Sequence, residues 1–284
     1  MIPNLSDQVV GDIIARALAE DIGLGDVTTL ATIDSGTPCQ AEVIAKAEGV
    51  VAGLWVAVAT FTSLDPEVDA RFAAHDGDRV KPGTVVLRLD GDAQAIVSAE
   101  RTALNFLQRM SGIATLTARY VAALEGTQTR ICDTRKTAPG SRALDKYAVR
   151  VGGGRNHRFG LFDGVLIKDN HIRAAGGIAQ AVQRAREGAH HLLCVEVEAQ
   201  SVEQVDEALQ AGADVVMLDN MGVEEVKQAV GFIAGRCKTE VSGNVNLQTV
   251  RAFAECGVDY ISVGALTHSA PALDLSLEIT DAQA

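Results

Sequence analysis

From residue 128 onward, short apolar runs alternate with stretches of helical spacing. The apolar runs are TRICDT, DGVLIK, LLCVEVEA, DVVMLDN, TEVSG and DYISVG, and they begin at residues 129, 163, 192, 214, 239 and 259. Between them lie IAQAVQRAREGA, SVEQVDEALQAG, VEEVKQAVGFIAG and NLQTVRAFAECG, the last three ending in glycine, a common helix stop. Continuous apolar strands separated by amphipathic helices predict a parallel sheet covered by helices. Six such units favour an α/β barrel or near-barrel, and a doubly wound open sheet is the alternative.

The first part of the chain has a different rhythm. A helix is expected from about Ser6 to Glu20, with Ser6 as its N-cap. Short β-like runs follow at CQAEVIAKA, GVVAGL, EVDARFAA and TVVLRLDG. A long helix is then expected from about Ala93 to Leu124, in which Gly112 marks a bend or a close packing contact.

Charge is unevenly distributed along this acidic chain. The formal net charge is -12, yet the segment from Arg130 to Arg158 carries +6 and the remainder therefore -18. The acidic total argues against general nucleic-acid binding, which needs an extended basic surface. A basic island on an acidic protein favours a focused site for a small, highly charged anion, and a solvated helix face is the alternative.

Cysteine usage and hydropathy indicate the compartment. The five cysteines are odd in number and form no Cys-x-x-Cys pair, which is typical of reduced cytosolic thiols rather than disulfides or a zinc site. The first ten residues, MIPNLSDQVV, lack basic residues and a long apolar stretch, so we expect no signal peptide. The uncharged run 49–64 is shorter than the ~20 residues of a membrane helix. We expect a soluble, cytoplasmic protein without membrane contact.

Polar residues recur at the ends of the predicted strands. In a parallel α/β barrel the carboxyl ends of the strands build the active site. The residues at these ends are Thr134, Arg135 and Lys136, then Lys168, Asp169, Asn170 and His171, then Glu198, Asp219 and Asn220, and finally Ser242, Gly243, Asn244, Gly264 and Ala265. From Glu198 onward they are spaced by 21, 23 and 22 residues, which is one strand–helix unit each. The spacing predicts that these residues share one rim.

The side-chain types at this rim indicate anion binding. Arg135 and Lys136 are donors suited to carboxylates and phosphates. The glycine-rich run 152–158 is expected to be a flexible loop that brings Arg155, His157 and Arg158 to the same place.

Two carboxylates and two turns complete the expected rim. Glu198 and Asp219 suit Mg²⁺ shared with substrate phosphates, or ion pairs with Lys136 or Lys168. The turns in VSGNVNLQT and VGALTHS, the second close to His268, are typical of a barrel phosphate site. Lys168 also admits a second interpretation, a Schiff-base lysine as in aldolases.

Several ordered motifs resemble one enzyme family. AERTALNFLQRMSGIAT, DTRKTAPGSRALDKYAVRVGGGRNHRFGLFDGVLIKDNHI, VEVEA, VVMLDN and DYISVGALTHS closely resemble the quinolinate phosphoribosyltransferases, also called nicotinate-nucleotide pyrophosphorylases (carboxylating). The resemblance implies an N-terminal α/β sandwich domain, residues 1–114 and 270–284, and an incomplete, open α/β barrel, residues 115–269. It also implies the Mg²⁺-dependent reaction of quinolinate with phosphoribosyl pyrophosphate to nicotinate mononucleotide, pyrophosphate and CO2, in de novo NAD biosynthesis.

The resemblance also assigns roles to matching residues. The implied quinolinate pocket contains Thr134, Arg135, Lys136, His157 and Arg158, and Lys168 is placed near phosphoribosyl pyrophosphate. Glu198 and Asp219 face the ribose and metal and, with Lys136 and Lys168, are the implied catalytic residues. The implied 5′-phosphate site comprises Ser242, Gly243, Asn244, Val263, Gly264, Ala265 and His268. Arg101 is implied to reach the partner subunit's site, in a homodimer that either stands alone or stacks into a hexamer.

One position departs from the family pattern, and three other functions stay open. The family commonly has Ser-Gly-Gly where this chain has Ser242-Gly243-Asn244, and we expect the turn to survive because asparagine tolerates unusual backbone angles. The nearest alternative is a phosphoribosyltransferase-like protein associated with molybdate transport. The others are a Schiff-base aldolase acting through Lys168 and a sensor that binds phosphorylated ligands without turnover.

Overall fold

The protein divides into two compact units. In a computed structural model, which describes residues 7–282, the first unit comprises residues 1–118, 137–153 and 266–284, and the second comprises 119–136 and 154–265. The domain boundary expected at residue 114 stays a prediction. Within residues 7–282, no helix is both long enough and apolar enough to cross a membrane.

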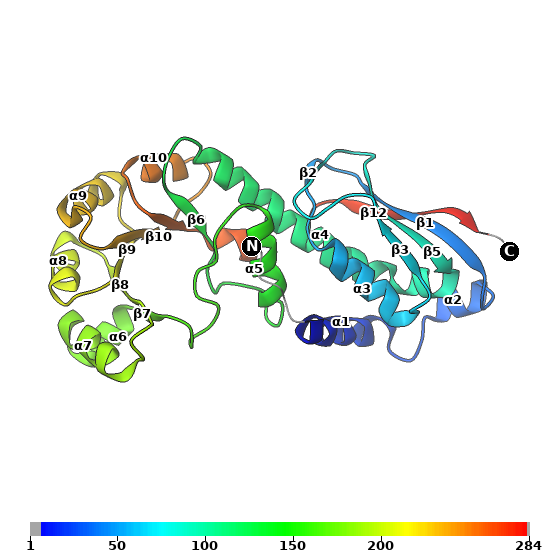
Figure 1. The fold of residues 1–284 in the computed structure, drawn as a ribbon, viewed down its shortest axis with the longest axis horizontal. Coiled ribbons are helices and arrows are strands. Elements are labelled where there is room, and N and C mark those ends of the chain that lie inside the picture. The colour runs from blue at the N-terminus through cyan, green and yellow to red at the C-terminus, as the bar shows by residue number, and fades with distance from the viewer. Residues whose placement is uncertain (1–6, 283–284) are drawn as a thin grey trace. The chain divides into compact units, whose positions relative to one another are not determined.

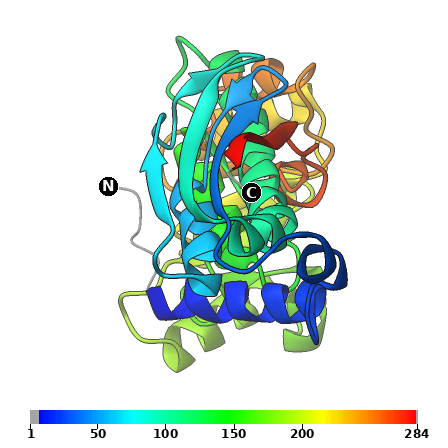
Figure 2. The same cartoon turned by 90° about the vertical axis from the view of Figure 1, so that its right-hand side faces the viewer.

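The first unit contains a four-stranded antiparallel sheet. Its strands are β1 (Pro38–Ala45), β3 (Asp69–Phe72), β5 (Val85–Asp92) and β12 (Leu275–Ala282), in the spatial order β12-β1-β5-β3. Figure 2 looks onto this sheet, with β1 in blue beside the red β12. A two-stranded ribbon, β2 (Gly49–Val50) and β4 (Arg79–Val80), lies in the same unit. The last strand of the chain therefore completes a sheet begun by the first.

Two helices bury the inner face of this sheet. On β1 the side chains alternate, so that Cys39, Ala41, Val43 and Ala45 are buried while the residues between them are more exposed. The buried residues form one core with apolar side chains of α3 (Leu54–Leu64) and α4 (Ala93–Ala123). The long helix α4 agrees closely with the expected span 93–124.

Gly112 on α4 allows a close chain crossing. A Cβ atom added there would lie 2.1 Å from the carbonyl oxygen of Pro271. The sequence left open a bend or close packing at this position, and the structure shows close packing.

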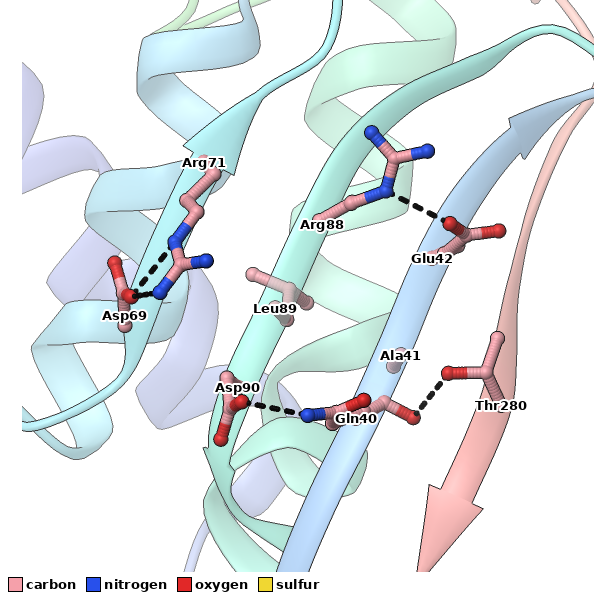
Figure 3. A pocket seen from close by; sticks show the side chains of 9 residues that line it. All are labelled: Gln40, Ala41, Glu42, Asp69, Arg71, Arg88, Leu89, Asp90 and Thr280. Atoms are coloured by element: carbon pink, nitrogen blue, oxygen red, sulfur yellow. Dashed lines mark hydrogen bonds and ion pairs between the residues drawn. The ribbon is translucent and has the colours of Figure 1, made fainter.

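The outer face of the sheet is polar (Figure 3). Arg88 on β5 pairs with Glu42 on β1 at 2.9 Å, and the Gln40 amide donates to Asp90 at 2.9 Å. Arg71 pairs with Asp69 on β3. Exposed pairs of this kind contribute about 0–1 kcal/mol each, so this face is a solvated sheet surface.

The remaining helices of the first unit are short or peripheral. They are α1 (Asp7–Ile22), α2 (Val27–Thr32), α5 (Arg142–Val151) and most of α11 (Ala265–His268). The expected N-terminal helix is therefore present, and its expected cap Ser6 lies outside the described residues. The polar stretch before Thr29 contains a helix start, because Asp26 accepts hydrogen bonds from the backbone N–H groups of Thr28 and Thr29.

The second unit is built on six parallel strands. They are β6 (Arg130–Cys132), β7 (Val165–Ile167), β8 (Val195–Ala199), β9 (Val215–Asp219), β10 (Lys238–Ser242) and β11 (Tyr260–Ser262). Their spatial order is β6-β11-β10-β9-β8-β7, and all neighbouring pairs are parallel. Each falls within one of the six predicted apolar runs or begins one residue before it. The first and last strands of this order, β6 and β7, do not pair, so the barrel is open, as the resemblance implied.

Helices connect successive strands of this sheet. They are α6 (Asp169–Ala175), α7 (Ile178–Gly188), α8 (Val202–Gln210), α9 (Val223–Ile233) and α10 (Val250–Glu255). Figure 1 shows α7 to α10 arranged around the strands they join. The four predicted helical stretches are present, although α10 begins at Val250 rather than near Asn246. Because every strand runs the same way, all six carboxyl ends lie at one rim.

The glycine-rich run contacts strand β6 through its backbone. Arg155 forms a parallel β-bridge with Cys132, donating its N–H to the carbonyl of Ile131 and accepting from the N–H of Asp133. The segment therefore lies along the edge of β6 that does not pair with β11.

Candidate active site

The carboxyl ends of the second unit's strands surround a cavity of about 640 Å³, which we call the rim cavity. This volume is in the range of small-molecule sites. The predicted residues that line it are Thr134, Arg135, Lys136, His157, Arg158, Lys168, Glu198, Asp219, Ser242, Gly243 and Asn244. Asp169, Asn220 and Glu240 add further polar groups. Most of the residues that were expected at one rim therefore line this cavity, and they come from six separate segments of the chain.

The basic island is divided by the fold. Of its eight cations, Arg135, Lys136 and Arg158 line the rim cavity, whereas Lys146 on α5 is buried in the first unit. Burial, and secondarily the positive charge of Arg135, lowers the pKa of Arg158. Only three of the eight cations therefore gather at the rim cavity, and the focused anion site stays a prediction for these three.

Two carboxylates lie at adjacent strand ends. Glu198 is the last residue but one of β8 and forms an ion pair with Lys168. Asp219 ends β9 and accepts a hydrogen bond from the side chain of Asn220 at 2.9 Å. Carboxylate oxygens are the donors that Mg²⁺ prefers, so this pair fits a magnesium ion shared with a phosphorylated ligand. The ion pair with Lys168 was the other sequence-based interpretation, and it is present.

The turn after β10 has Asn244 at the position where the family commonly has a second glycine. Gly243 has φ +91° and Asn244 has φ +55°, the left-handed region that asparagine adopts more readily than most residues. The Asn244 side-chain amide donates to the Asn220 side-chain oxygen at 3.3 Å. Asn244 thus has the kind of unusual backbone angle on which the expectation was based. Gly243 is the demanding position, because a Cβ atom there would lie 2.1 Å from the Asn220 oxygen.

Eight predicted residues do not line the rim cavity, and three of them are Asn170, His171 and Arg155. Val263, Gly264 and Ala265 follow β11 in the second unit, but the lining at that strand is Ser262. Arg101 is exposed on α4, and His268 is exposed at the end of α11. Both belong to the first unit.

Asp133 is a positioning residue that sequence reasoning did not assign. It is fully buried at the end of β6, and its carboxylate accepts from the backbone N–H of His157 at 2.8 Å and from the side chain of Asn156 at 2.6 Å. These bonds fasten the segment that carries His157 and Arg158. The sequence did contain a signal, because Asp133 is a single acid between the apolar strand and the cations Arg135 and Lys136. A carboxylate that is buried at such a position must accept hydrogen bonds.

His157 has its ring nitrogens engaged by the protein. Its Nδ1 accepts from the backbone N–H of Arg158 at 2.8 Å, so the ring proton resides on Nε2, which lies 3.0 Å from Glu196 and 3.7 Å from Glu240. These three side chains place candidate metal-ligand atoms within 4.8 Å of one another. An Nε2 that carries a proton cannot bind a metal, so hydrogen bonding is the better explanation of the cluster.

A second cavity lies at the other end of the strands. This base cavity, of about 400 Å³, is lined by the first residues of several strands, including Arg130, Val165, Val215 and Tyr260. It also contains Cys194, Glu196 and Arg155. His157, Arg158 and Glu240 line both cavities. They form a polar partition between the two ends of the open barrel.

Comparison with known proteins identifies the family. Residues 26–111 match the model for the N-terminal domain of quinolinate phosphoribosyl transferase, and residues 113–278 match the model for its C-terminal domain. The chain belongs to the quinolinate phosphoribosyltransferase family. The family models meet near residue 112, within helix α4.

Individual relatives in this family are similar over nearly the whole chain. The probable nicotinate-nucleotide pyrophosphorylase (carboxylating) of Bacillus subtilis (strain 168) is 48% identical over 261 residues, covering 92% of this chain and 90% of that protein. The chloroplastic nicotinate-nucleotide pyrophosphorylase (carboxylating) of Arabidopsis thaliana is 48% identical, covering 94% of this chain and 82% of that protein. The solved nicotinate-nucleotide pyrophosphorylase of Francisella tularensis superposes with a TM-score of 0.94 at 40% identity, covering 99% of each chain.

Proposed function

We propose that this quinolinate phosphoribosyltransferase family member transfers the phosphoribosyl group of phosphoribosyl pyrophosphate to quinolinate and decarboxylates the product. The products are nicotinate mononucleotide, pyrophosphate and CO2, in de novo NAD biosynthesis. The observation that carries the proposal is one cavity in which Arg135, Lys136 and Arg158 face the carboxylates Glu198 and Asp219. Such a cavity offers donors to a dicarboxylate and acceptors to a developing cation.

The basic side chains bind and orient the pyridine dicarboxylate. Arg135, Lys136 and Arg158 provide charge-assisted hydrogen bonds, each contributing about 1.5–3 kcal/mol. Thr134 lines the same wall, where its hydroxyl accepts from the backbone N–H of Lys136 at 3.0 Å. Held in this orientation, the pyridine nitrogen faces the anomeric carbon of the ribose, and binding both reactants together removes much of the entropic cost of their encounter.

The acidic side chains act on the sugar. As pyrophosphate leaves, the anomeric carbon gains positive charge, and the carboxylates Glu198 and Asp219 stabilise it. Lys168, paired with Glu198, faces the leaving pyrophosphate. The turn Ser242-Gly243-Asn244 binds the 5′-phosphate, with Val263, Gly264, Ala265 and His268 proposed as the remainder of that subsite.

Magnesium is the proposed metal. Glu198 and Asp219 would hold Mg²⁺, directly or through water, together with the substrate's pyrophosphate. The ion would neutralise charge on the leaving group.

The assembly and its location are also proposals. We propose a cytoplasmic homodimer, alone or stacked into a hexamer, in which Arg101 of each chain completes the partner's site. The exposure of Arg101 and its separation in sequence from the rim residues support this arrangement. The five cysteines, all within residues 7–282, form no disulfide, which supports a reducing compartment.

One set of parallel reactions tests the function. The purified protein, Mg²⁺ and phosphoribosyl pyrophosphate are incubated with quinolinate, nicotinate or nicotinamide, and pyrophosphate and CO2 are both measured. We expect release of both with quinolinate alone. Pyrophosphate without CO2 from another pyridine would contradict the assigned substrate, and no turnover by folded protein would contradict the enzyme itself.

The alternative functions gain no support. The relatives described above bear the name of the quinolinate enzyme, which does not favour the molybdate-associated protein. Schiff-base lysines are activated by an apolar pocket or a neighbouring cation, whereas Lys168 pairs with a carboxylate.

A further inference from the structure

The proposed reaction consumes a proton that none of the residues assigned so far supplies. When the carboxylate beside the ring nitrogen leaves as CO2, the electron pair of the broken carbon–carbon bond stays on the ring carbon. That carbon must then bind a proton to give nicotinate mononucleotide. A proton source inside the cavity is therefore a requirement of the chemistry, and the inference below rests on the proposed function.

The mechanism does not use two carboxyl groups near His157, namely Glu240 in the polar partition and Glu196 in the base cavity. Glu196 and Glu240 are 7% and 4% exposed, and one oxygen of each, Oε1, has no hydrogen-bond partner in the described part of the chain. Both approach the same imidazole nitrogen, Nε2 of His157. Two buried carboxylates this close cannot both be charged without a large cost, so the pair retains a proton.

The hydrogen bonds decide which carboxyl group keeps that proton. His157 is neutral, because its Nδ1 accepts from Arg158, and its single ring proton points to Glu196 at 3.0 Å. Glu196 therefore accepts the ring proton of His157 in a hydrogen bond. Glu240 lies farther from the ring, at 3.7 Å, and lines the rim cavity, which Glu196 does not.

We propose that Glu240 is the proton donor of the decarboxylation step. The ring carbon takes the proton of the Glu240 carboxyl group as its bond to the departing carboxylate breaks, and Glu240 becomes a carboxylate. A proton from solvent then restores the acid through the base cavity, which Glu240 also lines. The polar partition thus separates the substrate from bulk water on one side while remaining open to protons from the other.

The charges around Glu240 are consistent with this role. Burial, and then the negative charge of Glu196, raise the pKa of Glu240 to about 7. Asp133 at the end of β6 acts in the same direction, while the Ser262 hydroxyl on β11 acts against it. A positively charged His157 would also lower the pKa of Glu240, which the neutral ring does not do. An acid of this strength is protonated in much of the protein near neutral pH and can be replenished quickly, which general-acid catalysis requires.

The test separates pyrophosphate release from CO2 release in a single turnover. Quinolinate labelled in the carboxylate beside the ring nitrogen is mixed with excess enzyme, Mg²⁺ and phosphoribosyl pyrophosphate. For Glu240→Gln we expect pyrophosphate release near the wild-type rate, CO2 release slowed about 100-fold, and accumulation of the phosphoribosylated dicarboxylate. Glu255→Gln, at an exposed site on α10, is the matched control, and we expect wild-type rates from it.

The outcomes distinguish this inference from the proposed function. If the wild type releases no pyrophosphate with quinolinate, the proposed function fails. If the wild type is active but Glu240→Gln loses neither step, or loses both equally, the proton-donor role is wrong.

The pH profile provides a second test that does not depend on the Glu240 variant folding. The donor must be protonated, so wild-type CO2 release should fall as pH rises through about 7, the pKa of Glu240. In Glu196→Gln the neighbouring negative charge is gone, so this decline should move to lower pH. A decline that stays in place in folded Glu196→Gln would overturn the proposal.

Discussion

At the scale of single residues, backbone hydrogen bonds determine what the functional side chains can do. Asp133 accepts from the His157 N–H, and His157 Nδ1 accepts from the Arg158 N–H, so each residue of this short series orients the next. His157 was expected to bind quinolinate. Its ring nitrogens contact Arg158 and Glu196, so it also holds those residues in place, and its role in quinolinate binding stays a prediction.

Lys136→Ala tests the anion site directly. Lys136 is exposed and lines the rim cavity, so its removal should leave the fold intact. Loss of one charge-assisted contact costs about 1.5–3 kcal/mol, equivalent to a fall of about 10- to 150-fold in kcat/KM for quinolinate. Steady-state kinetics measure this, with Lys227→Ala, exposed on α9, as the control. Wild-type turnover by Lys136→Ala would remove Lys136 from the site.

Gly243→Ala tests the phosphate turn. The added methyl group would collide with the Asn220 side chain at a backbone angle that alanine rarely adopts, at a cost on the order of 1–3 kcal/mol. We expect a higher KM for phosphoribosyl pyrophosphate and a lower melting temperature. Gly231→Ala on α9 is the matched control, because a Cβ atom there has nothing within 4 Å and should stabilise the helix by ~0.5–1 kcal/mol. Equal behaviour of the two variants would contradict the steric argument.

At the scale of elements, helix α5 holds the segment that follows Lys136 through hydrogen bonds of Asp145. Asp145 on α5 is fully buried and accepts from Arg109 on α4 at 2.9 and 2.7 Å. It also accepts from the backbone N–H of Ala138 at 3.2 Å. The same guanidinium donates to the carbonyl of Thr267 at 3.0 Å. One ion pair thus joins three helices and one loop of the first unit.

Asp145→Ala should destabilise the first unit. Breaking a fully buried ion pair costs about 3–5 kcal/mol, and we expect about 2–3 kcal/mol here because the Arg109 side chain is 37% exposed. Urea denaturation followed by circular dichroism measures the free energy of unfolding. The comparison is Glu42→Ala, which breaks the surface pair with Arg88 and should cost about 0–1 kcal/mol. Similar losses of unfolding free energy in the two variants would show that the buried pair stabilises the protein no more than the surface pair does.

At the scale of the whole molecule, the first unit is built from segments that are far apart in the sequence. Strand β12 pairs with β1 along seven residue pairs, although more than 200 residues separate them in sequence. The second unit is therefore inserted between parts of the first. A homodimer with a shared site would add a second level at which distant residues act together, and Arg101 is the residue proposed to do so.

Subunit mixing tests the shared site. Arg101→Ala and Lys136→Ala should each have little activity, because each homodimer lacks one cation in both sites. A mixed dimer restores one complete site if Arg101 acts on the partner's cavity. We therefore expect activity to return after exchange, up to about half that of the wild type for each mixed dimer. Absence of recovery, with exchange proven by mass spectrometry, would place Arg101 in its own subunit's site.

Sequence alone determined the sheet and the residues at its rim. Runs such as VVMLD and amphipathic stretches such as VEEVKQAV have local periodicity, and parallel strands must place their carboxyl ends together, so Glu198, Asp219 and Ser242 were predictable. Tertiary structure alone decided the pairing of β12 with β1, the β-bridge at Arg155 and the approach of Glu196 and Glu240 to His157. These contacts join residues far apart in the chain, and their energies depend on burial and distance, which no local pattern records.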